Sequence, residues 1–232
     1  RKIKVIFCDE KRNPSSELVS YYGSHDTSNK VRKQIAWGQK IKEAVWTEIV
    51  TEKIRKQKEL LELKGKEEAE LLSSYLREIT WNDETNREGH AAKVYFNALF
   101  GKDFTRTEDN PINAALNYGY AIILSAFTRE VVTNGYITQL GLFHDNMFNQ
   151  FNLASDLMEP FRVLVDKEVL EMKPDKMEHE EKMRLVNILN YEVRIGGKIQ
   201  YVNNAIKIYC KSVFDALNEN DSALIQFYKI EL

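Results

Sequence analysis

One long helical segment, residues 110–135, constrains the fold more than any other part of the sequence. It opens with Asn-Pro, a strong start signal, because an asparagine side chain can cap the first turn and proline is tolerated in it. It closes with Asn-Gly, a common helix terminator. The residues between are mostly apolar and leave little polar face, so the helix has to be buried on most sides. We therefore expect a bundle with this helix at its centre.

Five more segments carry the helical period of apolar residues. They are residues 31–49, 67–79, 87–100, 152–172 and 203–217. Gly101 stops the third of them. Pro160 lies inside the fourth, where the helix either kinks or restarts, and the sequence leaves both open. Residues 191–195 and 198–202 flank a Gly-Gly pair, which is a two-residue hairpin signal. The predicted fold class is mainly α, with one late β-hairpin.

The chain opens on a strand-like apolar run, residues 3–8, and its first residue is not methionine. A single strand cannot satisfy its backbone groups, so either upstream residues are absent from this sequence or Tyr21 and its neighbours supply a partner. Cys8 ends the run, where a buried and unreactive thiol is expected. With Cys210 it makes two cysteines, too few for a disulfide framework or a structural zinc site.

Length and composition are those of a globular protein. The chain has 232 residues, of which 43% are hydrophobic and 29% charged, enough for one large domain or two small ones. It has no run of roughly 18 apolar residues and no signal segment. We therefore expect no membrane association and a cytoplasmic location.

A local excess of positive charge lies between residues 30 and 58, although the formal net charge of the whole chain is −2. This stretch holds nine Lys or Arg residues against three Glu, and such an excess can follow a phosphate backbone. The alternative is a long helix with a solvated basic face. The nine residues are Lys30, Arg32, Lys33, Lys40, Lys42, Lys53, Arg55, Lys56 and Lys58.

Three segments contain ionisable residues that a core does not require. Glu88 lies at an expected helix start, where the helix dipole favours a carboxylate. His144 ends an apolar run, as core and capping histidines do. Asp156 and Glu159 are three positions apart and share one helix face, a spacing common on solvated faces. Together the four form the mixed carboxylate–imidazole set that binds Mg²⁺ or Mn²⁺. Periodicity alone does not bring them together in space.

Three longer motifs contain these residues: residues 86–96 (NREGHAAKVYF), 112–120 (INAALNYGY) and 150–162 (QFNLASDLMEPFR). They resemble the CRISPR-associated spacer integrase family, the catalytic endonuclease of the adaptation complex, and most closely its type II-A branch. The resemblance spans essentially the whole chain. It implies that residues 1–25 are the end of an N-terminal β-domain, most of which is missing here, with a linker. Residues 26–232 would form a helical C-terminal catalytic domain.

The resemblance also implies a site. Glu88, His144 and Glu159 correspond to the family's Glu–His–Glu/Asp ligands for Mg²⁺ or Mn²⁺. Asp156 corresponds to an auxiliary acid that orients His144 or accepts a proton. Basic residues near this site and on the basic stretch are the expected contacts to DNA phosphates, with exposed solubilising charges as the alternative. They are Arg87, Lys93, Arg162, Lys53, Arg55 and Lys56.

The implied reaction inserts a short DNA fragment into a CRISPR array: a 3′-hydroxyl of the fragment attacks a repeat phosphodiester, and a DNA 3′-hydroxyl leaves. The implied partners are the fragment, the leader-repeat DNA, a second copy of the chain and a small second subunit, in a bacterial cytoplasm. The type II-A branch adds a DNA-end-binding accessory protein and the effector nuclease. Two alternatives stay open: a hydrolytic metal-dependent nuclease, and a non-catalytic helical scaffold that binds DNA or protein.

Overall fold

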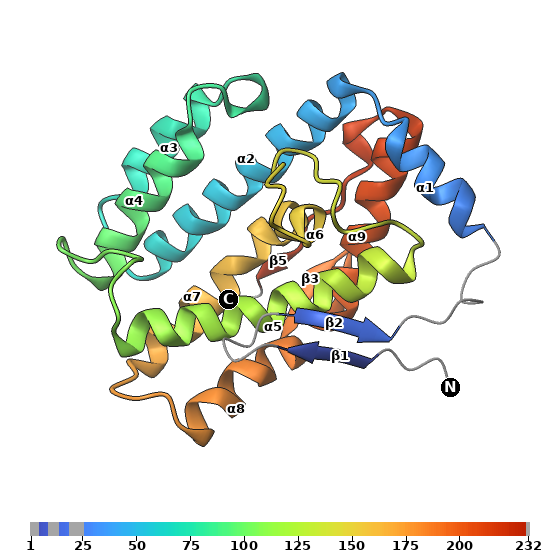
Figure 1. Cartoon of the computed structure of the whole chain (residues 1–232). Coiled ribbons are helices and arrows are strands. Elements are labelled where there is room, and N and C mark those ends of the chain that lie inside the picture. The colour runs from blue at the N-terminus through green and yellow to red at the C-terminus, as the bar shows by residue number, and fades with distance from the viewer. Residues whose placement is uncertain (1–4, 9–13, 19–25, 231–232) are drawn as a thin grey trace. The chain divides into compact units, whose positions relative to one another are not determined.

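The computed structural model describes residues 5–8, 14–18 and 26–230 (Figure 1). Its helices are α1 (Thr27–Ile35), α2 (Gln39–Leu63), α3 (Ala69–Glu78), α4 (Arg87–Phe100), α5 (Pro111–Thr133), α6 (Asn152–Met158), α7 (Arg162–Met172), α8 (His179–Asn187) and α9 (Val202–Glu219). Single-turn 3-10 helices are η1 (Trp81–Asp83), η2 (Glu159–Phe161), η3 (Ile188–Asn190) and η4 (Ser222–Leu224). The strands are β1 (Val5–Cys8), β2 (Pro14–Leu18), β3 (Glu192–Ile195), β4 (Lys198–Tyr201) and β5 (Lys229–Ile230). The predicted mainly α class is confirmed.

The described chain forms two compact units. The first comprises the described residues up to Val45, residues 121–158, and the residues from Leu189 onward. The second comprises residues 46–120 and 159–188. Helices α2 and α5 each contribute residues to both units. The division predicted at residue 25 stays a prediction. No helix in the described ranges is both long and apolar enough to span a membrane.

The opening strand is confirmed, and β2 supplies its partner. The two strands pair antiparallel, with Val5 opposite Leu18. The partner expected around Tyr21 therefore differs from the observed one, which begins a few residues after β1 ends. Tyr21 itself and the side chain of Cys8 lie outside the described residues. Val5, Phe7 and Leu18 are exposed, so these three side chains bury little apolar surface.

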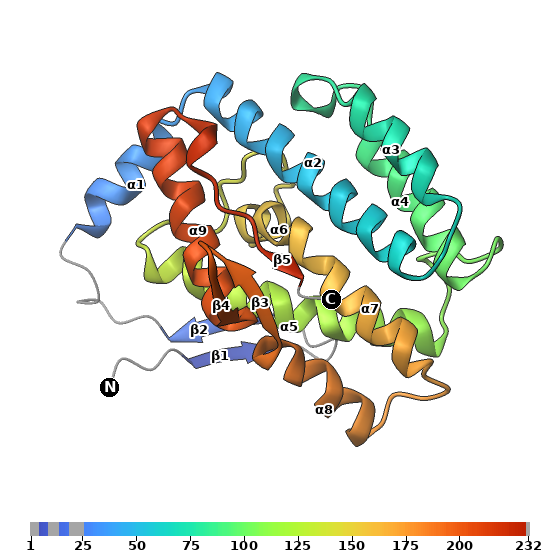
Figure 2. The same cartoon turned by 180° about the vertical axis from the view of Figure 1, so that it is seen from behind.

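The late hairpin of β3 and β4 is confirmed in the first unit. Gly196 and Gly197 have φ angles of 58° and 76°, the left-handed values that both central residues of a type I′ turn require and that glycine adopts without strain. Strand β5 pairs with the other side of β3, giving the order β4-β3-β5 (Figure 2). The sequence did not predict β5, because a two-residue strand carries no periodic signal.

The helical period between residues 31 and 49 belongs to two helices rather than one, since α1 ends at Ile35 and α2 begins at Gln39. Trp37 lies in the connection and is buried. Its ring centre is 5.2 Å from that of Tyr136, and its Nε1 donates a 3.1 Å hydrogen bond to Oδ1 of Asn218. The connection is therefore an anchored bend within the first unit.

Helices α4 and α5 follow their local signals closely. The side chain of Asn86 accepts a hydrogen bond from the backbone of Gly89, and Gly101 ends α4 with a φ of 111°. Oδ1 of Asn110 accepts a 2.8 Å hydrogen bond from the backbone N–H of Asn113, which caps α5 as predicted. Only three of the 23 residues of α5 are exposed, so the expected burial of this helix on most sides is confirmed.

Two features of the second unit go beyond the sequence predictions. Pro160 lies in η2, which joins the end of α6 directly to the start of α7, so the α-helical hydrogen bonding is interrupted at the proline. Helix α8 was not predicted; it begins with a reciprocal capping box between Glu178 and Glu181. In the same unit, a Cβ on Gly119 would lie 2.4 Å from Cγ1 of Val165, so glycine permits the close approach of α5 and α7.

Candidate active site

The N-terminus of α4 holds Glu88 in place through a neighbouring carboxylate. Asp83, which is buried and has a positive φ of 49°, accepts hydrogen bonds from the backbone N–H groups of Arg87 and Glu88 at 2.8 and 3.0 Å. These amides have no partner inside the helix, so Asp83 satisfies them and fixes the first turn. The Glu88 side chain is 30% exposed.

Glu88 and Glu159 converge on the ammonium group of Lys53. Nζ of Lys53, in α2, donates to Oε1 of Glu88 and, at 2.5 Å, to Oε2 of Glu159 in η2. Nε of Arg162 donates to the other oxygen of Glu159 at 2.9 Å. Lys53 and Glu159 are 8% and 5% exposed. Two carboxylates and two cations thus form a charge-balanced cluster, which is what burial of such groups requires.

The ionisation of this cluster reflects the balance between burial and charge. Burial alone would raise the pKa of Glu159, but Arg162 and Lys53 outweigh it and lower that pKa from 4.5 to about 2. Burial would lower the pKa of Lys53, yet Glu159 and Glu88 raise it above its ordinary value. Glu159 is therefore a carboxylate at neutral pH, in the form that can bind a cation.

Tyr120, Asp166 and Tyr95 form a buried polar cluster beside Arg162. The guanidinium carbon of Arg162 lies 4.7 Å from the centre of the Tyr120 ring, a cation–π contact. The Tyr120 hydroxyl donates to Oδ1 of Asp166, and the Tyr95 hydroxyl donates to Oδ2 of Asp166 at 2.9 Å. Burial raises the pKa of Asp166 to about 6, although both tyrosines and nearby arginines act in the opposite direction. Sequence reasoning missed this group, whose only local sign was an acid one helical turn after Arg162.

The pKa of Asp166 predicts a pH dependence of stability. A carboxyl with a pKa of 3.8 when unfolded and about 6 when folded binds its proton more tightly in the folded state. The stabilisation of the folded state by this proton is therefore fully present below pH 3.8 and is lost as the pH rises through 6. The free energy of unfolding falls by about 3 kcal/mol in total. The Asp166→Asn variant lacks this titration. Urea unfolding at about pH 4.5 and 7.5 should show wild type losing about 2 kcal/mol relative to Asp166→Asn. A constant difference between the two proteins would contradict the shifted pKa.

In the first unit, Asp156 organises the loop that carries His144. Its carboxylate has no exposed surface and accepts hydrogen bonds from the backbone N–H groups of Leu142, Phe143 and His144 at 2.6, 3.1 and 3.1 Å. Oδ1 of Asp156 also lies 2.5 Å from Nδ1 of His144. A Cβ on Gly141 would lie 2.3 Å from the carbonyl oxygen of His144, so only glycine fits this tight loop.

The contact with Asp156 determines the chemistry of His144. When Nδ1 donates its proton to the carboxylate, Nε2 carries the lone pair and can ligate a cation. This carboxylate–histidine arrangement is common behind metal ligands, where it orients the ring. Of the two roles considered for Asp156, orientation of His144 fits the geometry.

The structure brings some of the predicted ligands together and not others. Glu88 and Glu159 meet at Lys53 in the second unit, and His144 pairs with Asp156 in the first. Among the residues that the structure describes, no group of three or more His, Cys, Asp or Glu side chains is assembled around a metal position. The three-ligand site with Mg²⁺ or Mn²⁺ stays a prediction. Its two carboxylates already share one cation.

The predicted basic DNA-binding face requires a correction. Lys53 and Lys56 are 8% and 2% exposed, so neither lies on a solvated face that could contact phosphates. Lys56 pairs with Glu52 and Glu59 along α2. A lysine in the apolar stripe of a helix, four residues after buried Ile49, was the available sign that Lys53 points inward.

The remaining predicted DNA contacts stay predictions. The Arg55 side chain is 47% exposed and pairs with Glu52. Arg87 forms a 2.8 Å ion pair with Glu78. Lys93 is exposed on α4. Arg162 is engaged by Glu159, which makes it a structural partner of the carboxylate as well as a candidate phosphate contact.

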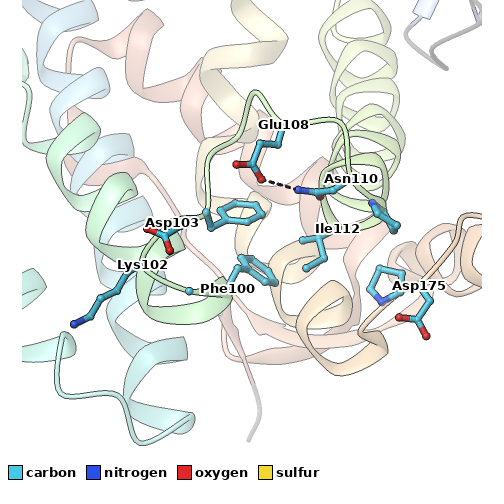
Figure 3. Close-up of a pocket in the computed structure, with 11 residues that line it drawn as sticks. Phe100, Lys102, Asp103, Glu108, Asn110, Ile112 and Asp175 are labelled. Atoms are coloured by element: carbon cyan, nitrogen blue, oxygen red, sulfur yellow. Dashed lines mark hydrogen bonds between the residues drawn. The ribbon is translucent and has the colours of Figure 1, made fainter.

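A separate hollow of about 530 Å³ opens in the second unit, and none of the predicted site residues lines it (Figure 3). Phe100, Phe104 and Ile112 give it an apolar surface, while Lys102 and Asp175 lie at its edge. Its lining includes Asp103 and Glu108 but none of the proposed ligands. It is therefore not the candidate active site.

These features define a mainly helical protein in which a buried carboxylate, Glu159, and a partly exposed one, Glu88, share a cation. The chain belongs to the Cas1 family: the family model described as CRISPR associated protein Cas1 matches residues 1–187. A "CRISPR-associated endonuclease Cas1" from Neisseria meningitidis serogroup C is 34% identical over 197 residues, which are 82% of this chain and 65% of that protein. A "CRISPR-associated endonuclease Cas1 1" from Thermus thermophilus is 39% identical over 92 residues, 36% of this chain and 29% of that protein. The chain thus spans about two thirds of the length of the meningococcal relative.

Solved structures share the fold at low sequence identity. A chain of a "Cas6-RT-Cas1--Cas2 complex" matches with a TM-score of 0.77 at 19% identity, covering 100% of this chain and 30% of that chain. A "Casposase bound to integration product" matches with a TM-score of 0.71 at 17% identity, covering 94% of this chain and 76% of that chain. These matches establish the fold. The type II-A assignment stays a prediction.

Proposed function

We propose that this chain is the catalytic part of a Cas1 enzyme that joins short DNA fragments to a CRISPR array by metal-dependent phosphoryl transfer. The observation that carries the proposal is the convergence of Glu88 and Glu159 on one cation position in a chain of this family. Its similarity to a CRISPR-associated endonuclease, and the fold that it shares with a casposase solved with an integration product, support DNA as the substrate.

The donor set fits a hard divalent ion such as Mg²⁺ or Mn²⁺. Two carboxylates already meet at one cation, and with Nδ1 of His144 facing Asp156 the ligating nitrogen would be Nε2. We assign Glu88, His144 and Glu159 as the ligands. When bound, the ion would neutralise charge on the phosphate and make the attacking hydroxyl a better nucleophile.

The protein's own residues would position these ligands. Asp83 fixes the helix start that carries Glu88, Arg162 holds Oε1 of Glu159, and Asp156 orients His144. In the proposed transesterification, a 3′-oxygen of the fragment forms a new bond to phosphorus, and the bond from phosphorus to a 3′-oxygen of the repeat breaks. The attacking hydroxyl loses its proton and the leaving oxygen gains one. Such a reaction depends mainly on positioning and charge neutralisation.

The proposed partners are the DNA fragment, the leader-repeat DNA, a second copy of the chain and a small second subunit. The matched Cas1–Cas2 complex supports the small subunit. Because the chain spans about two thirds of the meningococcal relative, these assemblies are proposals for the whole protein. The accessory protein and the effector nuclease of the type II-A branch rest on the sequence resemblance.

A strand-joining assay tests the proposed reaction. The chain and its small partner subunit would be mixed with a short duplex with 3′-hydroxyl ends and a supercoiled plasmid carrying a leader and repeat. We expect covalently joined products that require Mg²⁺ or Mn²⁺. Metal-dependent cleavage without joining would support the hydrolytic nuclease instead. DNA binding with neither product, and no Mn²⁺ binding, would support the scaffold.

A further inference from the structure

The two proposed carboxylate ligands are held together by a lysine that belongs to neither of their elements. Lys53 comes from α2, Glu88 from the first turn of α4 and Glu159 from η2. Glu88 and Glu159 lie 35 and 106 residues from Lys53 along the chain. The contact is therefore tertiary, whereas most lysine–glutamate pairs of α2 are local pairs three or four positions apart.

We propose that Lys53 is a positioning residue whose ammonium occupies the cation position between Glu88 and Glu159 until a divalent ion takes it. This inference rests on the proposed function, since it concerns the same carboxylates. Arg162 contacts Glu159 at Oε1, whereas Lys53 contacts it at Oε2 and also contacts Glu88. Lys53 is thus the cation that links the two carboxylates.

Electrostatics explains why such a group is useful. Two carboxylates whose oxygens approach a common point repel each other unless a cation lies between them. Glu159 is 5% exposed, so water cannot replace that cation efficiently. An ammonium has one charge and three donors on a flexible stem, so it can hold the pair and still be displaced by a doubly charged ion. The site would then be kept in order in its metal-free state, and metal binding would be a competition.

Lys56 offers a matched control on the same helix. It is 2% exposed and pairs with Glu52 at 3.3 Å and Glu59 at 2.9 Å, so it also bridges two glutamates. Neither glutamate is a proposed ligand. Replacing either lysine by methionine removes a buried ammonium from α2, but only Lys53→Met removes a competitor for the metal.

The test measures Mn²⁺ affinity by titration of the metal alone, with the wild type, Lys53→Met and Lys56→Met. If the ammonium occupies the carboxylates about nine-tenths of the time, its removal tightens Mn²⁺ binding by about tenfold. We expect this change in Lys53→Met, together with a lower melting temperature in chelator that Mn²⁺ restores. Lys56→Met should bind Mn²⁺ like the wild type. Equal or weaker binding by Lys53→Met would overturn the inference.

A measurement on the wild type covers the case in which Lys53→Met does not fold. Acylation of lysines can be followed by mass spectrometry with and without Mn²⁺. We expect Lys53 to react about tenfold faster with Mn²⁺ present, because its ammonium has left the carboxylates, while Lys56 stays unchanged. An unchanged rate at Lys53 in a protein that binds Mn²⁺ would refute the inference alone. No Mn²⁺ binding by the wild type would refute the proposed metal site, and the role of Lys53 with it.

Discussion

Replacing Glu88, His144 or Glu159 is expected to lower the rate of strand joining by about a thousandfold or more, while DNA affinity changes by only a few-fold. Affinity for DNA is a sum over many phosphate contacts, whereas charge stabilisation at one phosphorus depends on a single ion. Loss of one ligand removes or displaces that ion, and small displacements in such sites cost orders of magnitude in rate.

The choice of substitution matters because of the buried charges. Glu159→Ala would leave Lys53 and Arg162 with one fewer carboxylate, and an uncompensated buried charge costs about 3 to 5 kcal/mol. Glu159→Gln removes the same charge, although it keeps the size of the side chain and an acceptor oxygen. Glu88→Gln and His144→Ala, at side chains that are 30% and 42% exposed, are therefore the more informative variants. Exposed Glu84 and His179 provide matched controls, and their alanine variants should join DNA like the wild type. Joined products that persist in Glu88→Gln and His144→Ala would exclude these residues as ligands.

The second large effect is expected at Asp156. The Asp156→Ala change removes the acceptor of three backbone N–H groups and the partner of Nδ1 of His144, all at one buried carboxylate. Since each unsatisfied buried donor costs about 1 to 3 kcal/mol, we expect a loss of about 3 to 5 kcal/mol in the free energy of unfolding. Urea unfolding at neutral pH measures it. Asp145, exposed in the same loop, is the control, and Asp145→Ala should change stability by less than about 0.5 kcal/mol.

The Asp156→Asn variant distinguishes the two roles of Asp156, which are to hold the loop and to orient the imidazole of His144. An amide retains one acceptor oxygen for the loop, but its NH₂ group would face Nδ1 of His144 and favour the opposite tautomer. We expect a smaller loss of stability than in Asp156→Ala and a loss of strand joining of about a hundredfold, with unchanged DNA binding. Wild-type joining by Asp156→Asn would show that the orientation of His144 does not depend on this carboxylate.

Several parts of the molecule were predictable because their signals are local. Helix α4 begins at Arg87 and ends at Phe100 as predicted, since a capping side chain and a terminal glycine lie beside those residues. The late hairpin follows from two glycines that adopt positive φ. The candidate ligands came from motifs that resemble a family, and the family is confirmed.

Other features depend on residues far apart in the sequence, and local sequence patterns predicted them wrongly or not at all. The excess of positive charge between residues 30 and 58 predicted a basic surface, but Lys53 points inward, where two carboxylates from distant elements contact it. In the sequence, Asp166 is an ordinary acidic residue of a helix. In the second unit, the hydroxyls of Tyr95 and Tyr120 donate hydrogen bonds to its buried carboxylate.

Local backbone preferences thus determined where helices and turns begin and end, because capping and left-handed φ depend on immediate neighbours. The charge state and role of each buried side chain depend instead on which distant groups share its low-dielectric surroundings. The sequence by itself determined the helical class, the hairpin and the residue types of the site. Only the tertiary structure decided that a lysine, rather than solvent, lies between Glu88 and Glu159.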